Sequence, residues 1–379
     1  MPVFKTRSAE IVLSTADRMN YFCIMAIWRT RSANRAVAYW VLAGTVMLLI
    51  QVLLGGITRL TGSGLSITEW NVITGVIPPL RETQWLAEFE KYKQTPQFHL
   101  LNADFTLNDF KFIFFWEWFH RLWARLVGVV FVVGFVWLLL KRKMKSEMIA
   151  PLLILFLLGL MQAVIGWIMV ASGLTGDALY VKPTRLALHF IFAIGLISYA
   201  FWFSLKLLIP VIGVRNARGL RGFSIGMLVL IFFQLLYGAL MAGNKAAAIA
   251  PGWPKINGDW LPPTLLREKP VLLNFIGNSI TIHFIHRNLA YLILICVCTW
   301  TVKLFSSGII RNQRSRLLLP LALVFLQVLL GILTLIVSPG IVANRWVMFD
   351  WLALLHQLNG LLLLFSIIYS IYVLKPMNK

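Results

Sequence analysis

Charged residues are scarce in this chain of 379 residues: they make up 13% of it, whereas soluble proteins carry about 25%. Acidic residues are the scarcer sign, with 14 Asp and Glu against 35 Lys and Arg, so the net charge is +21. Hydrophobic residues make up 59% of the chain. This composition excludes an ordinary soluble domain and indicates repeated membrane spans of about 20 apolar residues each.

Cysteine is also scarce. Cys23, Cys296 and Cys298 are too few and too poorly spaced for a disulfide framework or a cysteine-based metal site. No basic stripe interleaved with exposed aromatic residues accompanies the positive charge, so nucleic acid is not an expected partner. The apolar runs lack the alternation of two residues that membrane β-strands show. These absences leave an all-α integral membrane protein.

Eight apolar runs are long enough to cross a membrane as helices. We expect these spans at Ala36–Thr58, Phe112–Leu140, Ile149–Ala171, Leu186–Leu205, Phe223–Ala242, Ile280–Val302, Leu317–Val337 and Trp351–Leu374. The N-terminus, the connections after the second, fourth and sixth spans, and the C-terminus hold 20 basic and 3 acidic residues. The positive-inside rule therefore places both termini in the cytoplasm.

Residues 1–35 are then a cytoplasmic N-terminal segment. We favour the bacterial inner (plasma) membrane over the mitochondrial inner membrane, because the first span begins near residue 36 without a clear long presequence. Two of the outer connections are long, at residues 59–111 and 243–279, and the first contains a short amphipathic helix from Glu82 to Lys93. These loops are either interfacial coil or a cover over an outward-facing site.

The spans repeat a pattern. The odd spans share Gln-x-x-x-Gly, at Gln51/Gly55, Gln162/Gly166, Gln234/Gly238 and Gln327/Gly331. The even spans each carry a histidine, at His120, His189, His286 and His356. The chain is therefore expected to form two pseudo-symmetric four-helix bundles, residues 36–210 and 211–379, which are parallel repeats because each has an even number of spans.

The four histidines fall at one depth, about 5–13 Å inside the outer boundary of their spans at a rise of about 1.5 Å per residue. A single buried histidine is usually a hydrogen-bonded structural residue, but four at equivalent positions favour metal ligation. Each is followed four residues later by Ala or Gly, which leaves room for a flat macrocycle. We predict one haem between His120 and His189, and a second between His286 and His356.

Five arginines lie towards the outer side of the spans and are candidates for pairing with haem propionates. They are Arg59, Arg121, Arg125, Arg287 and Arg345. Ordinary snorkelling to the membrane interface is the alternative interpretation of all five.

The two halves differ three residues before the first histidine of each, where one has Glu117 and the other has His283. A carboxylate beside a reacting group can relay protons or stabilise developing positive charge, so Glu117 is the candidate catalytic residue. A salt bridge to Arg121, four residues later on the same helix face, is the structural alternative.

These residues resemble the haem A synthase family over nearly all eight spans. The resemblance rests on Gly55 to Ser66 (GGITRLTGSGLS), Glu69-Trp70, Pro78-Pro79, Glu117-x-x-His120-Arg121, His189, His286-Arg287 and His356-Gln357-Leu358-Asn359-Gly360. It implies oxidation of the C8 methyl group of haem O to a formyl group by two hydroxylations and loss of water, giving haem A for cytochrome oxidase.

The resemblance also implies roles for single residues. Glu117 is the essential carboxylate, His120 and His189 flank the substrate haem, and His286 and His356 bind haem b. Haem O and dioxygen are the implied substrates, the electron donor is unknown, and a haem O synthase and a second copy of the chain are candidate partners. Some family members carry a cysteine pair in the first outer loop, but residues 59–111 contain none here.

Two other functions fit parts of this pattern. A dihaem cytochrome b would transfer electrons without modifying haem, and would not need Glu117. A haem carrier or assembly factor would release haem unchanged and would need no electrons.

Overall fold

The computed structural model describes residues 15–70, 74–210, 217–308, 316–342 and 345–376, with side chains from residue 35 except at Thr74. Among these residues, eight helices contain segments long and apolar enough to cross a membrane, and no strand is present. They are α1 (Thr15–Leu60), α4 (Leu107–Leu140), α5 (Ser146–Ala171), α6 (Pro183–Leu208), α7 (Ala217–Gly243), α9 (Ser279–Ser306), α11 (Leu319–Ile336) and α12 (Met348–Val373). The predicted all-α membrane fold with eight spans is confirmed.

Several helices extend beyond the apolar runs that predicted them. α4 begins at Leu107 rather than Phe112, because Thr106 and Asp109 form a reciprocal capping box ahead of the apolar run. The spanning part of α1 is Arg35–Leu60, but the helix itself begins at Thr15. The predicted N-terminal segment is thus helical from Thr15, and its first 14 residues lie outside the described part.

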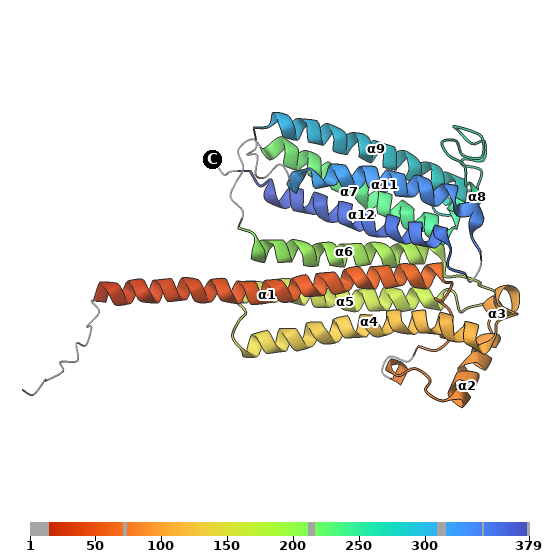
Figure 1. The fold of residues 1–379 in the computed structure, drawn as a ribbon, viewed down its shortest axis with the longest axis horizontal. Helices are drawn as coiled ribbons and strands as arrows, with labels where there is room; N and C mark the ends of the chain where they lie inside the picture. Colours follow the sequence, from red (N-terminus) through yellow and green to blue (C-terminus); the bar gives the residue numbers. More distant parts are fainter. Residues whose placement is uncertain (1–14, 71–73, 211–216, 309–315, 343–344, 377–379) are drawn as a thin grey trace, which may run out of the picture.

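Short helices gather at one end of the molecule, here called the loop end, whereas α1 begins and α12 ends towards the other, here called the terminus end (Figure 1). The short helices are α2 (Glu82–Lys93), α3 (Pro96–Leu101), α8 (Ala246–Ile249) and the 3-10 turns η1 (Thr74–Val76), η2 (Val271–Phe275) and η3 (Ser338–Gly340). The predicted helix Glu82–Lys93 is confirmed with the same bounds.

A buried polar cluster joins α2 and α3 into a cover at the loop end. The Tyr92 hydroxyl donates to Gln97 Oε1 at 3.1 Å and accepts from Asn102 Nδ2 at 2.7 Å. Gln97 Nε2 then donates to the carbonyl of Leu179, in the connection between α5 and α6. This chain of contacts ties the long first loop to a second loop, so the first loop is structured rather than plain interfacial coil.

The spanning helices pack as two neighbouring groups of four, with α6 and α1 facing α7 and α12 (Figure 1). A polar contact crosses the boundary between the groups: Gln357 Nε2 of α12 donates to the carbonyl of Val52 in α1 at 2.9 Å. Gly56 lies directly against the same Gln357 amide. A larger residue than glycine at position 56 would therefore displace the Gln357 amide and weaken its hydrogen bond to Val52.

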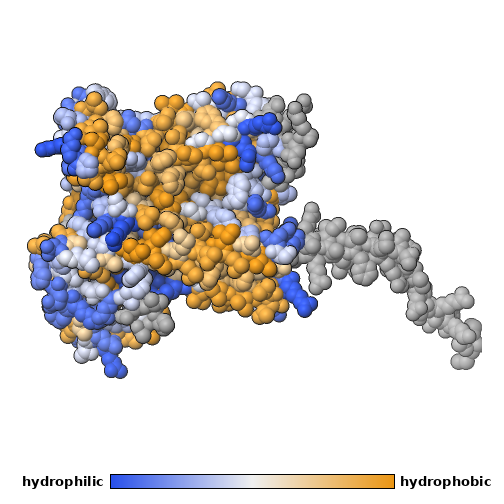
Figure 2. Space-filling model, turned by 180° about the vertical axis from the view of Figure 1, so that it is seen from behind, coloured by the Kyte–Doolittle hydropathy of each residue, from blue (hydrophilic) through white to orange (hydrophobic). Residues whose placement is uncertain are grey.

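The apolar cores fill the terminus side of both groups. One surrounds Met227, Val297 and Trp300 in the last four spans, and the other surrounds Leu138 and Leu152 in the first four. All buried members of these two clusters lie further from the loop end than the four histidines. On the face seen in Figure 2, a wide apolar belt lies between hydrophilic residues at both ends, as a bilayer-spanning protein requires.

Candidate functional site

Each of the four histidines lies against a glutamine and a glycine of the preceding spanning helix. The sets are His120 with Gln51 and Gly55, His189 with Gln162 and Gly166, His286 with Gln234 and Gly238, and His356 with Gln327 and Gly331. The amide nitrogen of each glutamine lies 3.1–3.4 Å from one or both ring nitrogens of its histidine. The Gln-x-x-x-Gly repeat and the histidine repeat therefore meet in space. Each histidine with its glutamine and glycine is here called a cradle, and the described residues contain four of them.

The glycines are needed because the imidazoles occupy the space of a side chain. A Cβ atom would lie 3.2 Å from His120 Cε1 at Gly55 and 2.9 Å from His189 Cε1 at Gly166. At the other two cradles the distances would be 3.3 Å at Gly238 and 3.0 Å at Gly331. Glycine thus fixes where each ring sits, beyond the close helix approach that a small residue allows.

The structure brings the histidines together as two pairs. The rings of His286 and His356 have centroids 6.4 Å apart, with their planes at 70°. His120 and His189 are close enough to interact electrostatically. With metal–nitrogen distances of about 2 Å, two imidazoles on opposite sides of one metal have centroids about 6 Å apart. Among the described residues no group of three or more His, Cys, Asp or Glu could hold a metal ion.

Unpartnered buried atoms around the rings also fit a bound group. Nδ1 of His286 and the amide oxygens of Gln51, Gln162 and Gln234 have no hydrogen-bond partner in the described residues. The fourth glutamine differs, because Gln327 Oε1 accepts a hydrogen bond of 2.7 Å from Asn359. Buried polar atoms are seldom left unpaired, so these positions suit a ligand. The two imidazoles of each pair are a donor set that fits a haem.

Glu117 lies on α4, one turn closer to the loop end than His120, and is 2% exposed. Its Oε2 accepts from the Ser66 hydroxyl at 2.7 Å and from the backbone N–H of Ile67 at 2.9 Å. Its Oε1 accepts from Arg121 Nη2 at 2.5 Å. The salt bridge to Arg121 is thus present, and the first loop holds the other oxygen, so both oxygens of the carboxylate are fixed in place.

Arg121 continues this network into the loop. Its guanidinium donates to the carbonyls of Ile67 and Glu69, both at 3.3 Å, and lies 4.9 Å over the ring of Trp70. The segment from Ser66 to Trp70 is therefore wrapped around one buried ion pair. This segment overlaps the GGITRLTGSGLS and Glu69-Trp70 motifs of the sequence.

The last four spans repeat the arrangement with different chemistry. Arg287 donates to the ring nitrogen Nε2 of His283 at 3.0 Å, where Arg121 contacts a carboxylate. The same guanidinium donates to the carbonyls of Gly252, Pro254 and Lys255. Both arginines that follow a histidine therefore hold a loop segment at the loop end.

The three remaining arginines occupy different settings. Arg59, in the last turn of α1, interacts electrostatically with the buried Asp350 at the start of α12, across the boundary between the two groups. Arg125 is half-buried on α4, one turn beyond Arg121, and Arg345 is exposed ahead of α12. A propionate-binding role for the five arginines stays a prediction.

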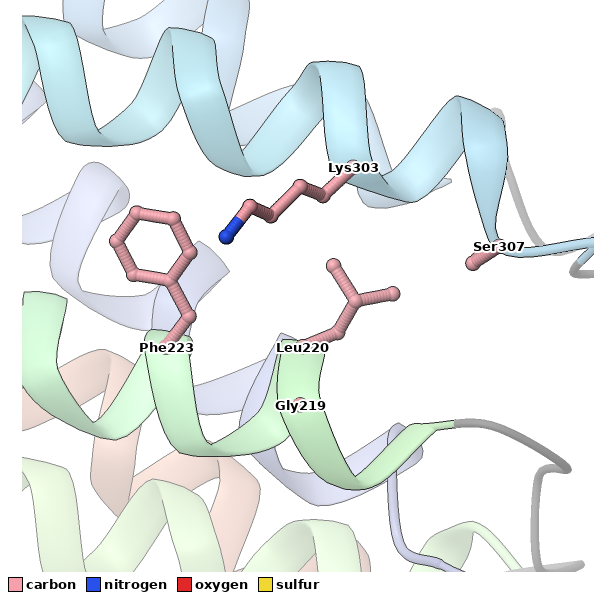
Figure 3. A pocket seen from close by; sticks show the side chains of 5 residues that line it. All are labelled: Gly219, Leu220, Phe223, Lys303 and Ser307. Carbon is pink, nitrogen blue, oxygen red and sulfur yellow. The ribbon is translucent and has the colours of Figure 1, made fainter.

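A hollow also lies at the terminus end, between α7 and α9. Figure 3 shows its lining, which comprises Gly219, Leu220, Phe223, Lys303 and Ser307. The Lys303 ammonium lies 5.3 Å over the Phe223 ring. Because the histidines lie near the opposite end of the helices, this hollow does not belong to their site.

Sequence reasoning identified the glutamines and the histidines but did not place them in contact. Their shared spacing could have indicated it, since Gln-x-x-x-Gly occurs once before every histidine. Ser66, Ile67 and Asn359 were not recognised as partners of site residues, although Ser66 and Asn359 stand within the motifs quoted above. No periodicity links residues 51 positions apart, so only the structure reveals the contact between Ser66 and Glu117.

The fold and the site define a multi-pass helical membrane protein with two pairs of glycine- and glutamine-cradled histidines. A family model described as cytochrome oxidase assembly protein matches residues 38–368. A heme A synthase of Flavobacterium psychrophilum is 36% identical over 348 residues, which cover 89% of this chain and 98% of that protein. The chain therefore belongs to this cytochrome oxidase assembly family.

Two further relatives are similar over most of their length. A heme A synthase of Rhodospirillum centenum is 39% identical over 349 residues, 92% of this chain and 91% of the relative. One of Paracoccus denitrificans is 38% identical over 345 residues, 89% of this chain and 87% of the relative. The resemblance drawn from the motifs is thus confirmed.

Proposed function

We propose that this protein is a haem A synthase, which oxidises a methyl group of haem O to a formyl group and so gives haem A. The substrate haem lies between His120 and His189. The observation that supports this assignment is Glu117, a buried carboxylate held by three donors beside His120, where the other pair of histidines has His283 instead. A cytochrome that only transfers electrons has no need of this difference.

Glu117 acts as a fixed negative charge. Both of its oxygens already accept hydrogen bonds, so it is better arranged to stabilise positive charge developing on the substrate than to carry protons. Arg121 and the segment Ser66 to Trp70 hold the carboxylate in position and cover the loop end of the site. Because Glu117 is only 2% exposed, little water reaches the carboxylate, which strengthens its electrostatic interactions.

The second pair, His286 and His356, holds haem b. When bound, that group supplies one-electron transfer to the substrate site. The protein's own contribution there is to orient the two imidazoles through Gln234 and Gln327, and to close the loop end through Arg287 and residues 252–255. We further propose that the chain divides between residues 210 and 211 into two halves. The first half holds the pair His120 and His189, and the second holds the pair His286 and His356.

The surroundings follow from the same assignment. The loop end faces outward and both termini face the cytoplasm of a bacterial inner membrane, in keeping with the excess of basic residues at the terminus end. Dioxygen is the co-substrate, with electrons from a separate donor. A haem O synthase would supply the substrate, and a second copy of this chain is a candidate partner.

The test is to express the protein with a source of haem O, extract the haems and separate them by chromatography. The wild type should yield a formyl-bearing haem. Glu117→Ala should lose it and retain haem b, and Glu117→Gln should fall on the order of 100-fold, because the amide keeps the size but removes the charge.

Glu90→Gln is the matched control, since Glu90 is an exposed carboxylate on α2 that pairs with Lys93. It should leave the formyl-bearing haem at the wild-type level. A wild-type protein that holds haem b but makes no oxidised haem under reducing, aerobic conditions would exclude the proposed reaction.

A further inference from the structure

The two groups of four helices close differently. In the last four spans, α7, α9, α11 and α12 form a complete ring in which α9 packs against α11. In the first four spans α1 packs on α4 and α6, and α5 packs on α6, but α4 and α5 do not make an equivalent contact along their lengths. Among the described residues, Phe131 and Phe156 join α4 and α5 nearer the terminus end, with ring centroids 6.1 Å apart.

The side chains that face this break are exposed. The helices α4 and α9 can be aligned by placing His120 at the position of His286. The exposed Ala124, Gly128 and Val132 of α4 are then equivalent to Ala290, Leu294 and Cys298 of α9, which are all half-buried. The helices α5 and α11 can be aligned by placing Gly166 at the position of Gly331. The exposed Phe156, Ala163 and Trp167 of α5 are then equivalent to Leu321, Val328 and Ile332 of α11, which are also half-buried. We call these six first-group residues, together with Gly159, the α4/α5 face.

Two glycines of the α4/α5 face stand where the last four spans have core side chains. Gly128 is the counterpart of Leu294, and Gly159 is the counterpart of Val324. Leu294 and Val324 both pack in the core of the last four spans. A Cβ at either glycine would meet nothing within 4 Å. The first group therefore has open space at the depth where the second is filled.

A polar atom without a partner marks the end of this space nearest the histidines. The buried amide oxygen of Gln162 has no hydrogen-bond donor in the described residues. At the equivalent position, Gln327 Oε1 accepts from Asn359. Phe192 stands on α6 where Asn359 stands on α12, so the first group cannot make this hydrogen bond. A ligand with a hydroxyl group beside its ring would supply the missing donor.

We propose that the α4/α5 face holds the hydroxyethylfarnesyl side chain of haem O, and that this side chain enters sideways from the bilayer. The inference rests on the proposed function, and it identifies the part of the substrate that distinguishes haem O from haem b. The macrocycle lies between His120 and His189, the hydroxyl group meets Gln162, and the isoprenoid chain runs past Gly128 and Gly159 towards Phe131.

The length of the face suits this occupant. Phe131 lies 11 residues beyond His120 on α4, which is about 16 Å at a rise of about 1.5 Å per residue. Phe156 lies at a comparable depth on α5, 10 residues before Gly166. The contact between Phe131 and Phe156 closes the end of the face, so it admits a chain of limited length. The closed ring around His286 and His356 offers no such place, as a haem without a tail requires.

The test replaces two glycines of the first four spans by the residues at the equivalent positions of the last four spans. Full-length protein with Gly128→Leu, Gly159→Val or both is purified in detergent and titrated with haem O and with haem b, and binding at the first site is followed by the Soret band. The wild type should prefer haem O. The variants should lose affinity for haem O on the order of ten-fold, because filling an apolar site excludes groups as small as a methylene by that factor.

Haem b, which lacks the tail, should bind the variants as it binds the wild type. Gly195→Leu is the matched control: Gly195 is exposed on α6 with nothing within 4 Å of an added Cβ, and its counterpart Leu362 is also exposed. It should change neither affinity. The spectrum of the haem resident at His286 and His356 reports the folding of every variant.

Equal loss of both haems, or no loss of haem O in either single variant, would overturn the proposal and leave the face to ordinary lipid chains. Failure of the proposed function would look different. A wild-type protein that prefers haem O but never forms a formyl-bearing haem would exclude the reaction while supporting the occupant of the face.

Discussion

The first four spans and the last four build the same cradle but surround it differently. In both, a glutamine and a glycine hold each histidine, and an arginine next to the first histidine holds a loop. The differences are Glu117 in place of His283, and glycines 128 and 159 in place of Leu294 and Val324. In the function proposed above, the shared part serves to bind a haem and the differing part serves to change one.

This comparison separates residues by role more sharply than burial does. Glu117 and His283 are both buried, and both contact the arginine four residues later. Only the carboxylate brings a negative charge to the site. A duplicated scaffold thus provides an internal control for each proposed functional residue.

The strongest way to break the comparison is to remove one histidine from each pair. His286→Ala should abolish the resident haem b spectrum, because one of its two ligands is lost. His120→Ala should keep that spectrum and abolish formyl-bearing haem. Absorption spectra and haem extraction measure the two outcomes. An unchanged haem b spectrum in His286→Ala would contradict the proposed pairing.

A second test compares the cradles themselves. Gly166→Ala would place a Cβ 2.9 Å from His189 Cε1, whereas Gly238→Ala would place one 3.3 Å from His286 Cε1. The first should displace the ring and cost about 1–3 kcal/mol in the free energy of unfolding, and the second should cost less. Thermal unfolding in detergent and the haem content give the order. A larger loss of stability from Gly238→Ala than from Gly166→Ala would show that contact with the histidine ring does not determine which substitution is tolerated.

A third test concerns Gln327, whose amide oxygen has a partner among the described residues, unlike those of the three other glutamines that lie against a histidine. Asn359→Leu removes the donor to Gln327 Oε1 and should cost about 1 kcal/mol, with some loss of haem b from the second pair. Asn288→Leu is the control, because Asn288 is exposed and donates to the carbonyl of Phe284 in the same helix. Equal effects of the two substitutions would mean that the contact to Gln327 does not orient His356.

The smallest effect is expected outside the membrane, in the cover at the loop end. Burial raises the pKa of Tyr92 to about 12, against the opposing effect of the hydrogen bond from Asn102. Because the folded pKa exceeds the unfolded value of about 10, this contribution to stability is complete below pH of about 10 and is lost as the pH rises through 12. Ultraviolet absorption of ionised tyrosine would follow the transition, which Tyr92→Phe should remove. Ionisation of all tyrosines at the ordinary pKa would contradict it.

Hydropathy predicted all eight spans, because burial in lipid demands long apolar runs. It could not place their ends. α7 begins at Ala217 rather than Phe223, since the polar first turns lie outside the apolar run. The short helix Pro96–Leu101 was not predicted, although Thr95 and Pro96 are a recognisable cap and first residue.

The site was predictable where it repeats and not where it is unique. Four histidines and four glutamines at constant spacing reveal themselves within one sequence. The contacts of Glu117 with Ser66 and Ile67 join a helix to an irregular loop, and hydrophobic periodicity carries no information about such a pairing. The break between α4 and α5 also needed the structure, because single glycines in a membrane helix are common.

The glycine contacts have a consequence for how a haem would be taken up. Each imidazole is confined between a glycine backbone and a glutamine amide of the chain itself. Fixing a flexible side chain at the moment of binding costs about 0.5–1.5 kcal/mol. Contacts within the protein itself fix the four rings, so a haem bound as proposed would be spared most of that penalty.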